Sequence, residues 1–180
     1  KAINIYEIFN LQSSISDILK YQGLIKYEQD QLEEANIFFN KSLAIKTKIG
    51  DKLGESQVLF QLAQSLIAKN NVHLAITSAK SSLSIAEKIG SKYEAKLSSG
   101  FLHHLYYKVG IFDQAYAYLE KYNLHSECLI DQQKINDIGK LESRYILNSA
   151  KNENKILQKE KAIQLIELNQ RQLQIKNQNT

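Results

Sequence analysis

The feature that most constrains this chain is an internal repeat of forty residues. The stretch SLAIKTKIGDK at 42–52 returns as SLSIAEKIGSK at 82–92. Ala35, Ala75 and Ala115 follow one another at the same spacing. A fixed period of this length is typical of arrays in which each unit packs on the next. The repeat therefore predicts a stack of equivalent structural units.

The composition indicates that these units are helical. The chain has no proline and only seven glycines, so almost nothing breaks a helix. We therefore expect an all-α fold. The absence of methionine and the leading lysine indicate a piece of a longer protein.

Several classes of protein are disfavoured by the sequence. The lone Cys128 excludes an internal disulfide, and no apolar run approaches the roughly 18 residues that cross a bilayer. The net charge of +4 comes mostly from scattered lysines, whereas nucleic-acid binding favours a clustered basic face. We expect no nucleic-acid binding by this chain, and membrane association only through other parts of a parent protein.

Each unit is predicted to contain two helices. In the middle unit the turn sequence KNN at 69–71 separates two apolar stripes. These stripes comprise Leu59, Leu62, Ala63 and Leu66, and then Leu74, Ala75, Ala79, Leu83 and Ile85.

The repeated string predicts a helix end followed by a helix start. Gly50 and Gly90 suit the left-handed conformation that ends a helix. Asp51 and Ser91 then suit the N-cap of the next helix, and Ser91 with Glu94 forms a capping-box pattern.

The period also predicts the domain boundaries. We expect a stack over 1–130, comprising a half repeat at 1–12 and repeats at about 13–51, 52–91 and 92–130. The half repeat KAINIYEIFN is predicted to be the end of an earlier helix, because Ile5 and Phe9 lie forty residues before Ile45 and Ile49.

The region 131–180 is predicted to begin with a capping helix and to continue as a long helix. The cap would cover the end of the stack with Ile135, Ile138, Leu141 and Tyr145. The long helix carries a short heptad seam at Ile156, Ile163, Ile166, Gln170 and Leu173. Two interpretations fit this seam: a terminal helix without a partner, and a homodimeric coiled coil that transmits a conformational change.

The repeats resemble those of the tetratricopeptide repeat (TPR) family. Ala35, Ala75 and Ala115 match the small residue that opens the second helix of that repeat. The small residue of the first helix matches Gly23 and Ala63, and His103 less well. HEAT-type repeats share the forty-residue period, but these small residues favour the TPR family, and the KIGD-type turn resembles its forty-residue type. The resemblance covers about residues 1–130 and implies a right-handed α-α superhelix of helical hairpins.

The sequence also departs from the family pattern. Gln22 stands where Leu62 and Leu102 match, the turn glycine occurs only as Gly110 followed by Phe112, and the closing proline is missing. The usual period is 34 residues rather than forty.

The same resemblance implies a concave groove that binds a peptide or another protein. Its positions map onto Asp17, Lys20, Leu24, Tyr27, Gln57, Phe60, Gln64, Ile67, Leu97, Gly100, His104 and Tyr107, with Lys108 beside them. The candidates expected to contact a ligand are Lys20, Tyr27, Gln57, Phe60, Gln64, His104, Tyr107 and Lys108. Only Lys20 matches the clamp by which some family members hold a C-terminal carboxylate.

A narrower resemblance concerns the segment KINDIGKLESRY and the helix after it. Together with the stack, they look like the sensory region of bacterial membrane-bound histidine kinases. This implies a sensory or scaffolding role, on the periplasmic side of a membrane, with any kinase core beyond Thr180. Two alternatives stay open: a cytoplasmic, peptide-controlled regulator of a response regulator or transcription factor, and a simple assembly adaptor.

No residue pattern indicates catalysis, a cofactor or a metal. His103 and His104 are adjacent, so they point about 100° apart on a helix. His125 and Cys128 share a helical face, but zinc requires two further ligands nearby. We expect this chain to have no enzymatic activity of its own.

Overall fold

The structure is a computed structural model that describes the backbone of residues 2–178 and the side chains of residues 11–161. The helices are α1 (Ala2–Glu28), α2 (Leu32–Ile49), α3 (Lys52–Ala68), α4 (Val72–Lys88), α5 (Lys92–Lys108) and α6 (Phe112–Gln178). The described residues contain no strand, which confirms the predicted all-α fold. The chain divides into two compact units, Lys1–Ile130 and Asp131–Thr180.

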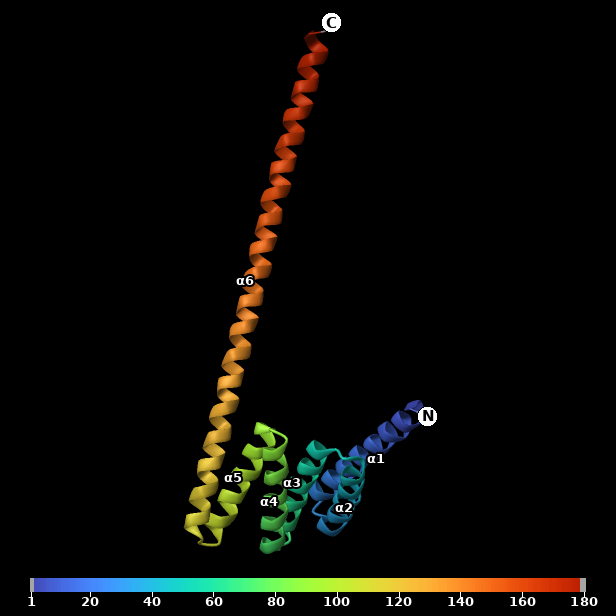
Figure 1. Ribbon diagram of the computed structural model, residues 1–180, viewed down its shortest axis with the longest axis vertical. Coiled ribbons are helices and arrows are strands. Elements are labelled where there is room, and N and C mark those ends of the chain that lie inside the picture. Colours follow the sequence, from blue (N-terminus) through green and yellow to red (C-terminus); the bar gives the residue numbers. More distant parts are fainter. Residues whose placement is uncertain (1, 179–180) are drawn as a thin grey trace. The chain divides into compact units, whose positions relative to one another are not determined.

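The first unit is a row of helical hairpins. Each helix from α1 to α4 packs on the next one along the chain, and α5 packs on the start of α6 through the stacked rings of Tyr106 and Tyr118 (Figure 1). The helices α2 to α5 are nearly equal in length, at 17 or 18 residues. The second unit is a single helical segment, the part of α6 from Asp131 onward.

One left-handed residue ends each helix from α1 to α5. Asp30, Gly50, Asn70, Gly90 and Gly110 lie twenty residues apart and have φ angles of 58° to 78°. After each of them, the next N–H bonds to a carbonyl five residues back, as Asp51 N does to Lys46 O at 3.0 Å. This pairing is the Schellman motif, which satisfies the last carbonyls of a helix. The predicted role of Gly50 and Gly90 is confirmed.

The predicted separation of 1–12 from the first repeat is wrong. The helix α1 is continuous from Ala2 to Glu28. The position forty residues before Gly50 is Asn10, and the first glycine in this helix is Gly23. Asn10 therefore lies within a helix rather than ending one.

No helix begins at 131, where the capping helix was predicted to start. Residue 130, forty residues after Gly90, is isoleucine, and α6 continues through it without a left-handed residue. The predicted cap side chains Ile135, Ile138, Leu141 and Tyr145 are all more than half exposed. Ile156 of the predicted seam is exposed as well, and the other seam residues lie outside the described side chains.

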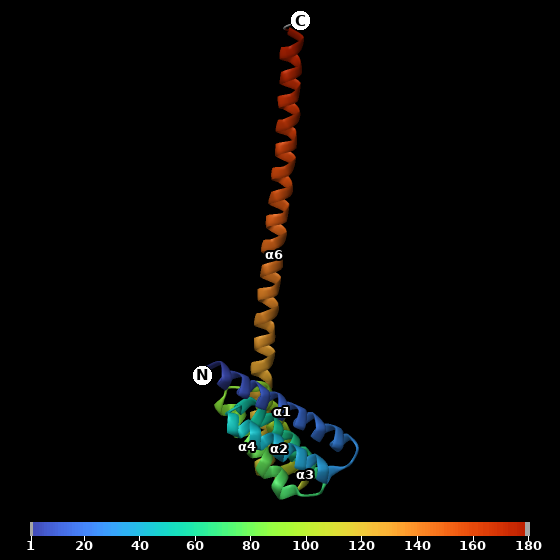
Figure 2. The ribbon, with the colours of Figure 1, turned by 90° about the vertical axis from the view of Figure 1, so that its right-hand side faces the viewer.

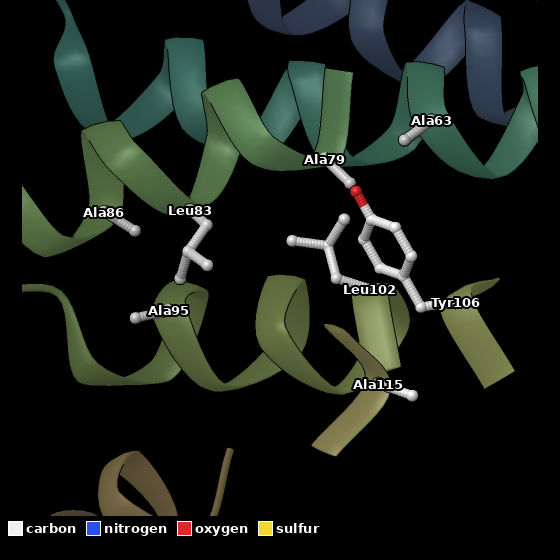
Figure 3. Close-up of a cluster of buried hydrophobic side chains, with 8 residues drawn as sticks. All are labelled: Ala63, Ala79, Leu83, Ala86, Ala95, Leu102, Tyr106 and Ala115. Carbon is white, nitrogen blue, oxygen red and sulfur yellow. The ribbon is translucent and has the colours of Figure 1, made fainter. Parts of the chain in front are cut away.

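The repeated alanines lie where helices touch. Ala35, Ala75 and Ala115 are at most 2% exposed. Figure 3 shows the cluster of the second and third hairpins, in which Leu83 of α4 points toward α5 and Leu102 of α5 points toward α4. The predicted stripe of α4 is right for Ala75, Ala79 and Leu83, but Leu74 is 54% exposed.

Buried serines form a second set of repeated contacts. Ser42 Oγ donates to Ser16 O at 2.7 Å between α1 and α2. Forty residues later, Ser82 Oγ donates to Ser56 O at 2.8 Å between α3 and α4. These small side chains allow the helices to approach closely while each of the donating hydroxyls keeps a partner.

The third hairpin replaces this serine pair by larger groups. The positions equivalent to Ser56 and Ser82 are Lys96 and Tyr122, and Lys96 Nζ lies 5.5 Å from the centre of the Tyr122 ring. Tyr122 fits because Gly100 stands opposite: a Cβ atom at Gly100 would lie 2.9 Å from the ring. A cation–π contact therefore takes the place of the serine hydrogen bonds.

The caps of α3 and α5 differ. Asp51 caps α3 as predicted, because its Oδ1 accepts from Gly54 N at 2.9 Å. The predicted capping box at Ser91 is wrong, since the Ser91 side chain makes no capping hydrogen bond. Glu94 instead turns toward α3 and accepts from Gln57 Nε2 at 2.9 Å.

Candidate functional site

The first helices of the three hairpins, α1, α3 and α5, share one face of the unit. A cavity of about 240 Å³ opens on this face. It is lined by Lys20, Tyr21, Leu24, Gln57, Phe60, Gln61, Tyr93, Glu94 and Leu97. We call this site the α1–α3–α5 groove. All three hairpins contribute to it, so its shape depends on how they stack.

The floor of the groove is apolar. Phe60 is 8% exposed and meets Phe101 edge-to-face, with ring centres 5.5 Å apart. The rim carries two exposed aromatic rings, Tyr21 and Tyr93, at 58% and 59% exposure. Such a combination suits a ligand that inserts an apolar side chain and stacks against tyrosine.

The ammonium group of Lys20 faces the groove and forms only a long ion pair with Asp17. Lys20 Nζ lies 3.7 Å from Asp17 Oδ1, longer than a hydrogen bond, and 5.0 Å from the centre of the Tyr21 ring. The Lys20 side chain is only 15% exposed. It is therefore well placed to pair with an acidic group of a ligand.

The reason that Asp17 does not hold Lys20 tightly lies in the stack. Lys46 of α2 is 2% exposed, and its Nζ lies 2.9 Å from Asp17 and 2.8 Å from Asp51. Burial lowers the pKa of Lys46, but its hydrogen bonds to Asp17 and Asp51 outweigh this, so the net shift is upward. Asp17 is thus engaged by a buried lysine, which leaves Lys20 available.

The same contacts act on Asp51. Burial raises the pKa of Asp51, but the hydrogen bonds from Lys46 and from Gly54 N–H lower it by more, so its pKa falls below the ordinary value. Both members of this ion pair are held in their charged forms.

The predicted groove residues fall into two groups. Lys20, Gln57 and Phe60 line the groove, as do Leu24 and Leu97. The remaining predicted contacts, Tyr27, Gln64, His104, Tyr107 and Lys108, do not line it.

Two of these remaining residues, Tyr27 and Tyr107, pack against other side chains. Tyr27 packs on the cluster that contains Ala35 and Phe39. The Tyr107 ring lies 5.6 Å from that of Phe112, at the turn into α6. His104 and Lys108 are exposed beyond the groove.

Four groove residues were missed: Tyr21, Gln61, Tyr93 and Glu94. A signal was present for the first two, which lie forty residues apart and directly follow Lys20 and Phe60. Tyr93 and Glu94 lie in the first turn of α5, where the sequence pattern indicated a capping box. Glu94 reaches the groove because its side chain accepts from Gln57 instead of closing a capping box with Ser91.

A larger hollow of about 530 Å³ lies on another face, between α2, α3 and α4. Leu43, Leu59 and Ile85 contribute its apolar lining. The equivalent position between α4 and α6 is bridged by Lys121 Nζ and Glu87 Oε1 at 2.8 Å. Only two hairpins form this hollow, and its single lysine, Lys80, lies over the Tyr106 ring at 5.4 Å.

Two of the four histidines, His103 and His125, pack against neighbouring helices. His103 Nδ1 lies 2.9 Å from Ala115 O, so this nitrogen carries the proton and donates. His125 is 5% exposed, and its Nε2 lies 3.6 Å from Glu87 Oε1. Across the part of the chain that the structure describes, no three His, Cys, Asp or Glu side chains gather closely enough to hold a metal ion.

Within the residues that the structure describes, no helix has an apolar stretch long enough to cross a bilayer.

Comparisons with known proteins support the fold. No family model and no curated protein sequence matches the chain. A crystal structure of the TPR domain of Arabidopsis FLU matches with a TM-score of 0.60 and 17% sequence identity. The match covers 65% of this chain and 98% of that domain. The chain therefore has the helical-hairpin fold of a TPR domain.

Proposed function

We propose that this chain is a non-catalytic module that binds an extended segment of another protein in the α1–α3–α5 groove. One observation carries the proposal: three successive hairpins line a single cavity with an apolar floor, two exposed tyrosines and a lysine whose ion pair with Asp17 is long. A surface built from equivalent helices suits an elongated ligand, because each hairpin contacts a different part of it.

The groove chemistry defines the expected ligand. An acidic group of the ligand pairs with Lys20, and an aliphatic or aromatic side chain enters between Phe60 and Leu97. The amides of Gln57 and Gln61 hydrogen-bond to the peptide backbone of the ligand. The expected motif is thus an acidic residue close to a large apolar one.

Selection of peptides tests this proposal. A library of random twelve-residue peptides displayed on phage is selected on the full chain, and the affinity of enriched peptides is measured. We expect Lys20→Gln and Tyr93→Ala each to weaken binding by about 5- to 30-fold, as for central contacts at interfaces. The matched controls Lys88→Gln and Tyr116→Ala alter the same residue types at exposed positions outside the groove and should bind normally.

Two results would contradict groove binding. One is a set of enriched peptides that bind the Lys20 and Tyr93 variants as tightly as the unchanged chain. The other is loss of binding only on substitution in the α2–α4 hollow, for example Ser84→Arg.

The wider role that we propose is sensory or scaffolding, within a bacterial two-component signalling protein such as a histidine kinase. Its support is the resemblance of the stack and the following helix to the sensory regions of such kinases. Ligand binding in the groove would change the stacking of the hairpins and thereby bias α6. In the parent protein, Lys20→Gln combined with Tyr93→Ala should reduce the signalling output, and an unchanged output would favour the adaptor alternative.

The segment of α6 from Asp131 onward is proposed to form a homodimer. Its support is the set of exposed apolar side chains on a helical segment, including Ile138, Ile146 and Leu157. Sedimentation equilibrium of the chain and of the variant Ile156→Lys, which lies in the predicted heptad seam, measures this. A concentration-dependent dimer that the variant abolishes is expected, and a dimer that survives it would place the interface elsewhere.

A further inference from the structure

The helix α1 carries an apolar stripe that its counterparts bury. Ile15, Ile18 and Ile25 are 40%, 58% and 56% exposed. They share one face of the helix with Gln22, because their spacing of three, four and three residues follows the helical period. We call these four residues the α1 stripe.

The repeat identifies the equivalent residues in α3. Forty residues after Ile18, Gln22 and Ile25 stand Val58, Leu62 and Ser65, which are at most 8% exposed. Val58 and Leu62 belong to one cluster with Ala35 and Phe39 of the preceding helix α2. In the second hairpin, this face is thus covered by α2.

The same arrangement recurs in α5. The equivalent residues Ser98, Leu102 and Leu105 are at most 1% exposed. Ser98 Oγ lies 2.9 Å from Ser82 Oγ of the preceding helix α4, and Figure 3 shows Leu102 pointing toward α4. Two of the three equivalent faces are therefore covered by the same kind of helix.

The covering helices have a common chemistry. Both bury an alanine and a serine at equivalent positions, Ala35 and Ser42 in α2 and Ala75 and Ser82 in α4, together with apolar residues that differ, such as Phe39 and Leu83. Small residues let the helix axes approach, and the larger apolar ones fill the remaining space. In Figure 2, α1 lies foremost in the first unit, and no described helix of that unit lies over it.

We propose that the α1 stripe binds an amphipathic helix of a partner protein, packed as α2 packs on α3. The basis is that the stack already contains this helix–helix interface twice, formed by α2 on α3 and by α4 on α5. Where the stripe has three isoleucines, α3 has Glu55, Val58 and Ser65, and α5 has Ala95, Ser98 and Leu105. The bulkier stripe therefore favours a helix with small residues over a second isoleucine stripe. This argues for a partner helix of the α2 or α4 type rather than a second copy of the chain.

This site is separate from the α1–α3–α5 groove. Ile18 and Ile25 do not line the groove, and Lys20 and Leu24 of α1 lie in it instead. A helix on the stripe and a peptide in the groove would therefore contact different sides of α1. The inference stands whether or not the groove binds a peptide.

The probe for this site is the sequence of α4 itself. A copy of residues 72–91 is fused ahead of Lys1 through a flexible Gly/Ser linker of about 25 residues, whose mean span of roughly 27 Å reaches the middle of α1. The linker raises the local concentration of the probe to about the millimolar range, which compensates for the low helicity of a short peptide. The thermal midpoint of the fused chain is compared with that of the unfused chain.

We expect the fused helix to raise the midpoint by several degrees. The gain should disappear in the double variant Ile18→Gln and Ile25→Gln, and in a fusion with a scrambled α4 sequence. It should persist in the matched control Ile37→Gln and Leu74→Gln, which removes two apolar groups of similar exposure elsewhere. Circular dichroism confirms that each unfused variant retains its helical content.

Three outcomes would overturn the proposal. The fused helix adds no stability, the gain survives the Ile18 and Ile25 substitutions, or the scrambled sequence stabilises equally. Self-association of the unfused chain that these two substitutions abolish would identify a second copy as the occupant, and would also overturn it.

Discussion

Two equivalent junctions between hairpins share the same backbone geometry, but one buries a charged lysine and the other buries an alanine. In the first junction, between α2 and α3, Lys46 lies buried between two aspartates. In the second, between α4 and α5, the equivalent of Lys46 is Ala86, which is fully buried. The left-handed glycine that precedes each N-cap is the same, Gly50 or Gly90. The backbone thus repeats where the side chains do not.

Within each junction, the residues at the neighbouring positions match the choice of lysine or alanine. Gly54 leaves room for Lys46, because a Cβ atom at Gly54 would lie 2.7 Å from Lys46 Cδ and 2.5 Å from Asp51 Oδ2. The equivalent of Gly54 is Glu94, which fits where the lysine has become alanine. Correspondingly, Asp17 is replaced by Gln57, which donates to Glu94. The comparison teaches that the repeated backbone fixes the space available at a junction. Which residues fill that space, and which of them are charged, differs from one junction to the next.

The largest expected effect comes from breaking the first junction. Lys46→Ala leaves Asp17 and Asp51 without their buried partner and should lower the free energy of unfolding by about 2–3 kcal/mol. Gly54→Glu alone should cost a similar amount, because its side chain meets that of Lys46. Urea unfolding of each variant measures both values.

Combining three substitutions tests whether the first junction can be converted into the second. Lys46→Ala, Gly54→Glu and Asp17→Gln together reproduce the second junction. The triple variant should therefore lose less free energy of unfolding than the three single variants lose in total, by at least about 1 kcal/mol. Strict additivity would show that the two junctions are not interchangeable.

A smaller and equal effect is expected from the shared glycines. Gly50→Ala and Gly90→Ala should each cost about 1 kcal/mol, because alanine is strained at positive φ. No atom lies within 4 Å of the position that the alanine methyl group would take at either glycine, so only the backbone conformation contributes. Thermal unfolding should give matching losses, and a clear difference between the two would mean that the side chains of the junction also set the turn.

The smallest effect is expected from pH, acting on the first junction. Since the pKa of Asp51 is lower when folded than its ordinary value, it contributes stability above about pH 4 that is lost as the pH falls through the folded value. Lys46, whose pKa is raised, contributes stability below about pH 10.5 that is lost at higher pH.

The variant Asp51→Asn isolates the acid-side contribution. Its amide oxygen still accepts from Gly54 N–H, so the cap is retained while the titratable carboxyl group is removed. Its stability should change less than that of the unchanged chain between pH 5 and pH 3. Equal changes would assign the acid sensitivity to other carboxylates.

Much of the fold could be predicted because its signals are local or periodic. The forty-residue spacing, the stops at Gly50 and Gly90 and the cap at Asp51 each depend on a few adjacent residues. The buried serines carried the same periodic signal, since Ser16 and Ser56 are forty residues apart. They were overlooked because serine is not expected in a core.

The errors arose where the outcome depends on contacts between distant residues. Ser91 and Glu94 fit a capping box, but Glu94 turns to Gln57 on another helix. Nothing near residue 46 shows that this lysine is buried, because its partner Asp17 lies on a different helix. The groove was predicted in part, since positions taken from a repeat pattern omit neighbours such as Tyr21 that reach it from the side.

The regular placement of left-handed residues has a consequence for how such a chain can change in length. A block of forty residues can be inserted or removed at a turn without altering the phase of any helix, whereas one added residue inside a helix would rotate everything beyond it by about 100°. Joining Asp51 directly to Lys92, for example, would place Glu94 where Gly54 leaves room for Lys46. This architecture can therefore grow or shorten by whole hairpins only where the residues on the two sides of the new seam fit together.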